Sequence, residues 1–150
     1  MAALFAVAGA WAQEFPSKLI TVVVPVPPGG VVDLAGRLAA EALAGELKST
    51  VLVDNKAGAS ANIGATYVAQ AKPDGYTLLA SYSLYHEVNP LLFSNLKWRP
   101  ESFVPIGRVV VTPSVVVVHP SLPVHSLKEF VEYARKNPGA ISFASQGTGS

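Results

Sequence analysis

The sequence predicts an α/β fold built on a parallel sheet, and three observations support this prediction. Short β-branched runs alternate with segments of helical spacing in the order βαβαβ over residues 19–80. Glycine and proline, 12 of each in 150 residues, gather between these runs and mark the connecting turns. The chain is 50% hydrophobic and 14% charged, so it carries enough apolar side chains to bury a core. Right-handed crossovers then place the helices on the faces of the sheet.

The first part of the chain supplies three strands and two helices. Its first run, L-I-T-V-V-V, is continuous and β-branched, as expected of a strand that is buried on both faces. In the segment that follows, Leu34, Leu38 and two later leucines recur on one helical face among alanines. The expected elements are strands at 19–24, 50–53 and 76–80 and helices at 31–47 and 60–71.

A second block begins near residue 103. Ser126 is a predicted helix N-cap, and Glu129 three residues later completes the pattern of a capping box. A strand that is followed by a small-residue loop normally leads into a helix, so the chain is expected to be part of a longer protein. The block is expected to hold valine-rich runs over 104–118, a helix over 126–136, a strand over 140–144 and a loop over 145–150.

Residues 1–12 are predicted to be an export signal. The apolar run at 2–10 has the length of a secretory core, and Ala10-Trp11-Ala12 has the small-x-small pattern of a cleavage site. The run is too short to span a bilayer, which needs about 20 residues. Only Met1 precedes it, so the basic start of such a signal is missing, as expected if the gene start is misplaced or the chain is clipped there. The alternative is a short buried segment at a true N-terminus.

Composition and motifs disfavour several classes of function. The net charge of +1 and the scattered Lys and Arg residues argue against nucleic-acid binding. The absence of Cys removes disulfides, thiol nucleophiles and thiolate metal sites. After the pair His86-Glu87, Pro90 stands where a zinc protease needs its second histidine. No G-x-S-x-G elbow is present, and the isolated His119 and His125 do not suggest a metal site. We therefore expect neither a metal nor a cofactor.

Loops at the carboxyl ends of the strands are the expected binding region, because ligands of open α/β sheets lie there. The loop P-P-G-G-V-V-D at 27–33 has two glycines that let the backbone approach a ligand, and a helix N-terminus with free N–H groups follows. This arrangement suits a carboxylate or a phosphate. The alternative is an ordinary tight turn, in which Asp33 balances the charge of the first helical turn. Three other loops could contribute, at 55–64, 81–86 and 145–150.

A series of longer motifs runs co-linearly through the chain. The motifs are F-P-S-K-L-I-T-V-V-V-P-V-P-P-G-G at 15–30, D-N-K-x-G-A at 54–59, N-I-G at 62–64, K-P-D-G-Y-T-L-L at 72–79, H-x-x-N-P at 86–90, F-x-P-I-G at 103–107, V-V-V-x-P-S-L-P at 116–123 and F-A-S-x-G-x-G-S at 143–150. Together they resemble the Bug family, the TctC-like extracytoplasmic solute receptors of tripartite tricarboxylate transporters.

The resemblance implies a fold and a domain organisation. The expected fold is α/β and periplasmic-binding-protein-like (type 2), with two α/β domains that have mixed or parallel sheets and are incomplete here. Residues 13–104 would be the first part of domain 1, and residues 105–150 a hinge strand and the start of domain 2. Members of the family are roughly twice as long, so the C-terminal half would be missing.

The resemblance also implies a function without catalysis. The expected protein is a periplasmic receptor that binds a small organic carboxylate and feeds the membrane permease subunits of a tripartite transporter or a sensor. The alternative from the residues alone is an exported α/β hydrolase that uses Ser81 or Ser145. The bulky Tyr82 departs from the small residues often found in the family's third loop and would either shrink the cavity or supply an apolar or aromatic wall. The expected ligand-binding residues are Gly29, Gly30, Val31, Val32, Asp33, Asn62, Ser81, Tyr82, Ser83, His86, Ser145, Thr148 and Gly149.

Overall fold

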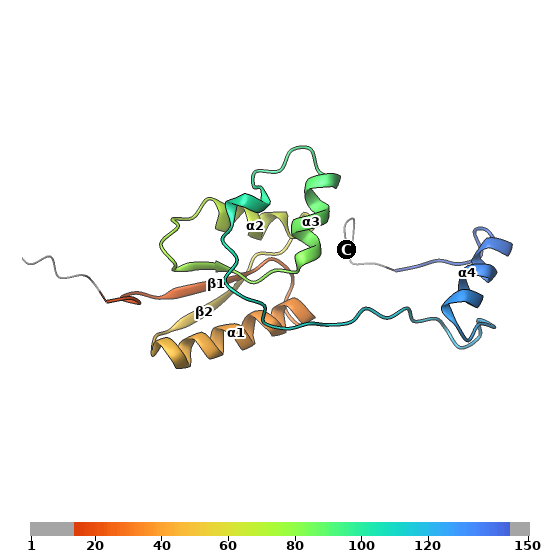
Figure 1. Ribbon diagram of the computed structural model, residues 1–150, viewed down its shortest axis with the longest axis horizontal. Helices are drawn as coiled ribbons and strands as arrows, with labels where there is room; N and C mark the ends of the chain where they lie inside the picture. The colour runs from red at the N-terminus through yellow and green to blue at the C-terminus, as the bar shows by residue number, and fades with distance from the viewer. Residues whose placement is uncertain (1–13, 145–150) are drawn as a thin grey trace, which may run out of the picture.

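Strand β1 (Ile20–Val24) lies at the centre of a three-stranded parallel sheet with the order β2-β1-β3. β2 (Val51–Asn55) pairs with all five residues of β1, and β3 (Thr77–Leu79) pairs with three of them on the other side. This computed structural model describes residues 14–144 (Figure 1). The predicted α/β fold and its three parallel strands are confirmed.

The core of the sheet is β1 itself. Ile20, Val22, Val23 and Val24 are all at most 2% exposed, because strands flank β1 on both edges and helices cover both faces. This burial explains why β1 is a continuous β-branched run in which Thr21 is the one polar residue. By the usual area relation, full burial of each such side chain contributes about 1.5–3 kcal/mol to folding.

Helix α1 (Val31–Leu47) has the predicted bounds, but it does not bury the predicted leucine face. Leu34 and Leu38 are 59% and 47% exposed. A Cβ at Gly36 would lie 2.6 Å from Val24 Cγ2, so the missing side chain lets the helix lie close against β1. Small side chains therefore decide which face packs on the sheet, and the leucines lie beside the contact. The buried residues of α1 are Asp33, Gly36 and Ala40.

Helices α2 (Asn62–Ala69) and α3 (Ser83–Leu92) lie on the side of the sheet opposite α1 (Figure 1). α2 lies within the predicted segment, whereas α3 corrects the prediction of a loop at 81–86. Pro90 lies inside α3, only two residues before its end. A proline removes one N–H donor and crowds the carbonyl of the preceding turn, which a helix tolerates near its end at some cost.

The chain leaves the sheet after a short 3₁₀ turn, η1 (Pro100–Ser102), and leads to helix α4 (Leu127–Lys136), which stands apart from the sheet (Figure 1). At the start of α4, Ser126 Oγ accepts a hydrogen bond from Glu129 N–H at 3.2 Å, as the capping pattern predicts. The Glu129 carboxylate accepts from His125 N–H at 2.7 Å rather than from the N-cap residue.

No strand forms in the described residues after β3, which corrects the predicted strand at 140–144 and gives the valine-rich segment 104–118 no sheet partner. A strand needs a neighbour to satisfy its N–H and C=O groups, and an apolar run alone does not supply one. The side chains of Val111, Val115 and Val117 are mostly exposed.

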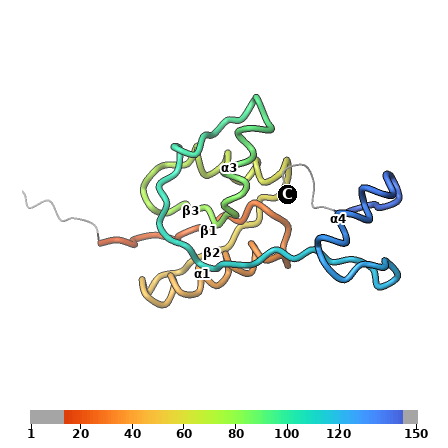
Figure 2. Tube along the Cα trace, turned by 45° about the vertical axis from the view of Figure 1, so that its right-hand side comes forward, coloured from red at the N-terminus to blue at the C-terminus, as the bar shows by residue number. Residues whose placement is uncertain are grey.

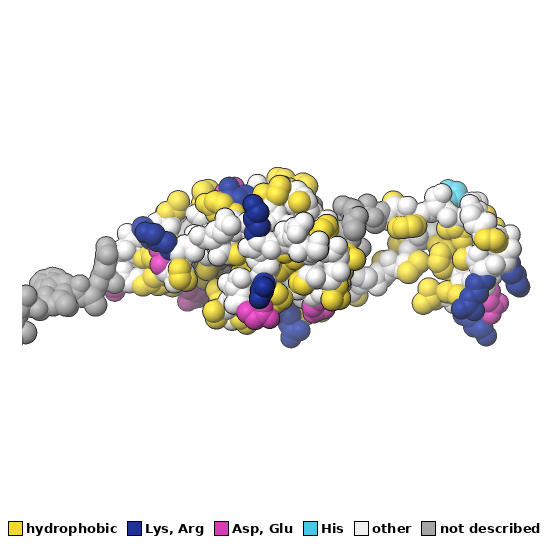
Figure 3. Space-filling model, turned by 90° about the horizontal axis from the view of Figure 1, so that it is seen from above, with side chains coloured by type: hydrophobic (Ala, Val, Ile, Leu, Met, Phe, Trp, Pro, Cys, Tyr) yellow, Lys and Arg dark blue, Asp and Glu magenta, His cyan; other side chains and the backbone are white. Residues whose placement is uncertain are grey.

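The distribution of charge on one face and the lengths of the described helices bear on possible partners. On the face in Figure 3, acidic and basic side chains are interspersed along the molecule. None of the described helices combines the length and the apolar character that crossing a bilayer would require.

Candidate ligand-binding loops at the carboxyl edge of the sheet

Three loops meet at the carboxyl edge of the sheet, because all three strands run parallel. The loop after β1 (residues 25–30) leads to α1 on one face, whereas the loops after β2 (56–61) and β3 (80–82) lead to helices on the other (Figures 1 and 2). The chain thus changes face between β1 and β3. Where the loops after two neighbouring strands lead to opposite faces of a sheet, they move apart and leave a crevice. This topological switch point is where ligands of open α/β sheets bind.

The loop after β1 ends in free backbone donors. Gly29 has a φ of +95°, which glycine adopts without the steric cost that a side chain imposes. Gly30 is extended and caps α1 without a side-chain hydrogen bond. Among the described residues, the N–H groups of Val31 and Val32 therefore have no acceptor, since the first turn of a helix has none of its own. These predicted residues therefore leave free N–H donors at the start of α1, which is the kind of helix end that can bind an anion.

Asp33, also predicted to face the ligand, is directed inward. It is 4% exposed, and Arg37 Nε donates to its Oδ2 at 3.0 Å while Arg37 Nη2 donates to its Oδ1 at 3.0 Å. Gly29 N–H also donates to Oδ2 at 2.9 Å. The Arg37 guanidinium, the Gly29 N–H and the Asn55 amide hold the pKa of Asp33 well below its usual range. Since Arg37 neutralises this carboxylate, the free N–H groups next to it keep their attraction for a bound anion.

Asn55 is a residue of this site that sequence reasoning missed. Its Nδ2 donates to Val26 O at 3.0 Å and to Asp33 Oδ1 at 2.8 Å, and its Oδ1 accepts from Arg37 Nη2 at 3.2 Å. The last residue of β2 thereby ties the loop after β1 to the first turn of α1. Its place at the end of a strand, within the D-N-K motif, was the available signal.

The loop after β2 approaches α2 through an unusual turn. Ala59, Ser60 and Ala61 have φ values of 49°, 54° and 69°, so three successive non-glycine residues are left-handed. Each such residue costs about 1–2 kcal/mol, and a turn of this kind persists only where its surroundings determine it. The predicted ligand residue Asn62 follows directly and begins α2.

The side-chain oxygen of Asn62 is bonded to two residues that the sequence prediction did not include. Its Oδ1 accepts a hydrogen bond from Asn89 Nδ2 at 3.1 Å and another from Trp98 Nε1 at 3.0 Å. The H-x-x-N-P motif was the signal in the sequence that could have indicated Asn89. No motif around Trp98 indicated its role.

The third loop places the remaining polar candidates at the same edge. Ser81 is half-buried, Tyr82 precedes α3, and Ser83 begins it with an exposed side chain. The rings of Tyr82 and Tyr85 meet edge to face at 6.0 Å between centroids. Within the described residues Ser81 makes no hydrogen bond to a histidine or a carboxylate, so it lacks the base that a nucleophilic serine requires.

His86 belongs to an aromatic cluster with Trp98 and Phe103. Its ring centroid lies 5.4 Å from that of Trp98 and 5.2 Å from that of Phe103, and both contacts are edge to face. Burial among these rings lowers the pKa of His86. The predicted ligand residue His86 therefore lies on the side of α3 that faces Trp98 and Phe103.

Acidification should destabilise the fold through His86. Because its pKa is lowered on folding, the unfolded chain binds the proton more tightly, and stability falls as the pH drops below about 6.5. We expect the melting temperature to fall between pH 7.5 and pH 5.5 in the wild type and to fall less in His86→Phe, as measured by circular dichroism. The exposed His125→Gln variant should retain the wild-type difference, and an unchanged difference in His86→Phe would contradict the assignment.

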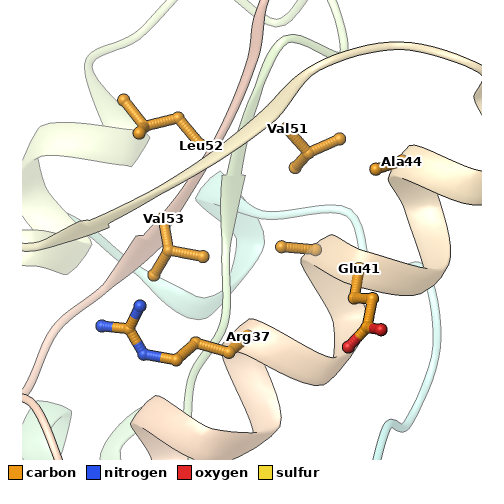
Figure 4. A pocket seen from close by; sticks show the side chains of 7 residues that line it. Arg37, Glu41, Ala44, Val51, Leu52 and Val53 are labelled. Carbon is orange, nitrogen blue, oxygen red and sulfur yellow. The ribbon is translucent and has the colours of Figure 1, made fainter.

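Two shallow grooves lie elsewhere on the described surface. Figure 4 shows the first, which is lined by residues of α1, among them Arg37 and Glu41, and by Val51, Leu52 and Val53 of the edge strand β2. The side chains of Val51 and Val53 point toward α1, whereas that of Leu52 points away from it. The second lies beneath the turn between α3 and η1. No predicted ligand residue lines either groove.

Some predictions lie outside the described residues. Residues 1–12, the proposed signal, and the candidates Ser145, Thr148 and Gly149 are among them. Within residues 14–144, no group of three or more His, Asp or Glu side chains could hold a metal ion.

The α/β framework is shared with solved structures of periplasmic binding proteins, among them BugD. A sequence profile described as "Tripartite tricarboxylate transporter family receptor" matches residues 35–150. The chain belongs to this family, whose members and structural neighbours are receptors and binding proteins rather than enzymes.

Curated relatives support the family over the whole chain. A UPF0065 protein of Bordetella pertussis is 37% identical over 150 residues, which are 100% of this chain and 46% of the relative. Protein BugT of Bordetella pertussis is 36% identical over 141 residues, or 93% of this chain and 43% of BugT. The chain thus spans less than half the length of the curated relatives that it matches.

Solved structures share the fold. A chain described as a periplasmic transporter is 40% identical with a TM-score of 0.81, over 90% of this chain and 46% of its own length. MatC from Rhodopseudomonas palustris, solved with bound malate, is 34% identical with a TM-score of 0.72, over 81% and 42%. A second R. palustris protein, solved with adipate, is 32% identical with a TM-score of 0.66, over 83% and 42%.

Proposed function

We propose that this chain is part of a periplasmic receptor that binds a small organic carboxylate and delivers it to the permease subunits of a tripartite transporter. The observation that carries the proposal is the pair of unpartnered N–H groups, Val31 and Val32, at the switch point of the sheet. The malate and adipate in two related structures support a carboxylate as the ligand class.

The energetics require donors from more than one loop. A helix N-terminus contributes about 0.3–1 kcal/mol to an exposed anion, and hydrogen bonds to charged groups contribute about 1.5–3 kcal/mol each. Micromolar affinity needs about 8 kcal/mol. The hydroxyls of Ser81 and Ser83 lie at the same edge and would add to the backbone donors. We further propose that residues 105–150 begin a second domain, which would supply further donors.

A single proline substitution tests the helix end as the carboxylate site. Val31 is the first residue of α1, where proline is well tolerated, and Gly30 has the extended backbone that a following proline requires. Val31→Pro therefore removes one N–H donor and leaves the helix intact. In calorimetric titrations of the whole protein with malate and adipate, we expect the Kd of the ligand that binds to rise about tenfold to a hundredfold.

Val31→Ala is the matched control, since it removes the same side chain and keeps the N–H group. Its Kd should stay within about threefold of the wild type. A thermal-shift series of mono-, di- and tricarboxylates identifies the ligand class, because ligand at 100 times its Kd adds about 2.7 kcal/mol of stability. A whole protein that binds no carboxylate, or a Val31→Pro variant that binds as the wild type does, would overturn the proposal.

A further inference from the structure

We infer that Asn62, Asn89 and Trp98 form a positioning network that fixes the start of α2 against the loop after β1. Asn62 thus acts on the proposed carboxylate site without needing to touch the ligand itself. This inference rests on the proposed function for its effect on affinity, while its effect on local structure stands independently of any ligand.

Asn89 and Trp98 are buried, and the hydrogen-bond partners of Asn89 define the orientation of its side-chain amide. Asn89 is 0% exposed, and its Nδ2 donates both to Ser60 O at 2.8 Å and to Asn62 Oδ1 at 3.1 Å. Both partners are acceptors, so the Asn89 amide has only one orientation that pairs with them. Trp98 Nε1 donates to the same Asn62 Oδ1 at 3.0 Å. One oxygen at the start of α2 therefore collects donors from α3 and from the chain that follows it.

The network acts on the one strained turn of the described edge. Ser60, whose carbonyl accepts from Asn89, is the middle residue of the three left-handed residues before α2. Residues in such conformations hold only where the surrounding structure determines them. Asn89 bonds to the middle of this turn, and Asn62, which directly follows the turn, is held by the bonds to its Oδ1. Loss of the network should therefore let the turn relax.

Movement of this turn would reach the candidate site through a direct backbone contact. Gly64, in the first turn of α2, packs so closely on Pro25 that a Cβ would lie 2.9 Å from Pro25 Cα. Pro25 opens the loop that leads to the free N–H groups of α1. The start of α2 and the loop after β1 therefore cannot shift independently.

Removal of the indole donor tests the network. Trp98→Phe removes Nε1–H and keeps an aromatic ring against His86 and Phe103. In the whole protein, we expect amide hydrogen exchange over residues 62–65 to accelerate about two- to tenfold relative to β1, and the Kd for the bound carboxylate to rise by a similar factor. Phe103→Leu is the matched control, because it disturbs the same aromatic cluster without removing a hydrogen bond to Asn62.

The outcomes separate the network from general destabilisation and from the proposed function. Phe103→Leu should lower the melting temperature with unchanged Kd and unchanged relative exchange over residues 62–65. Equal local exchange in Trp98→Phe and the wild type, or the same local increase in Phe103→Leu, would overturn the network. A wild type that binds no carboxylate would defeat the proposed function, and the exchange data would still decide the network.

A measurement on the wild type keeps the inference testable should Trp98→Phe fail to fold. The Trp98 indole N–H is buried and bonded, so its NMR signal should exchange with solvent at least tenfold more slowly than that of free indole. An indole proton that exchanges as freely as the model compound would overturn the bond to Asn62.

Discussion

Asn89→Asp is expected to destabilise the protein by about 2–6 kcal/mol at neutral pH. The substitution is nearly isosteric, but it replaces a donor of two hydrogen bonds with an oxygen that faces Ser60 O and Asn62 Oδ1. Each buried acceptor that loses its hydrogen-bond donor costs about 1–3 kcal/mol. The new carboxylate would also be fully buried, since Asn89 is 0% exposed. Denaturation by urea at pH 7 measures the loss.

The pH dependence of this variant provides a second signature. Burial raises the pKa of the introduced carboxyl, so the folded state holds its proton more tightly than the unfolded state. The loss of stability should therefore shrink as the pH falls toward about 5. Asn95→Asp, at an exposed position after α3, is the control and should change stability by less than about 0.5 kcal/mol. A mild, pH-independent loss in Asn89→Asp would show that the Asn89 amide does not hold the turn.

The sequence predicted the parallel sheet well, because burial on both faces leaves a direct trace in composition. A strand such as β1, flanked by strands and covered by helices, needs apolar side chains at every position, and such a run is easily recognised. The packed face of α1 could not be predicted in the same way. There the close contact depends on the absence of a side chain at Gly36, which hydrophobic periodicity does not register.

The sequence predicted the loops of the candidate site, but it did not predict the residues whose hydrogen bonds hold those loops in place. The glycines after β1 indicated an exposed backbone, and the structure gives α1 an uncapped N-terminus there. The roles of Asp33 and Asn62 were not predictable, because each depends on partners that are distant in sequence. Asn55 lies 22 residues from Asp33, and Trp98 lies 36 residues from Asn62. Only the fold brings these groups within hydrogen-bond distance.

The second block shows the limit of pattern reasoning most clearly. The helix at Leu127–Lys136 was predicted because its cap and its ends are encoded locally by Ser126 and Glu129. The strand expected at 140–144 depends on a neighbour that the described residues do not provide. Local signals are sufficient for a capped helix, whereas a strand exists only in a sheet.

Gly64→Ala is expected to destabilise the protein by about 0.5–2 kcal/mol net, although alanine favours helices. The added Cβ would lie 2.7 Å from Pro25 Cβ, 2.9 Å from Pro25 Cα and 3.0 Å from Lys56 O. Two of these atoms belong to the backbone, so no side-chain rotation relieves the contact and α2 must move away from the loop after β1. Overpacking of this kind costs about 1–3 kcal/mol, against a gain of up to about 1 kcal/mol from helix propensity.

Gly45→Ala is the control that separates the steric cost from the gain in helix propensity. It adds the same methyl group to a helix as Gly64→Ala does, but at a position with free space. Gly45 lies inside α1, and a Cβ there would meet no atom within 4 Å. That variant should gain about 0.5–1 kcal/mol in urea denaturation, opposite in sign to Gly64→Ala. Since Gly64 also sets the distance between α2 and the loop after β1, Gly64→Ala should weaken carboxylate binding as well. Equal gains in both variants would mean that α2 is free to move, and its start could not then position the site.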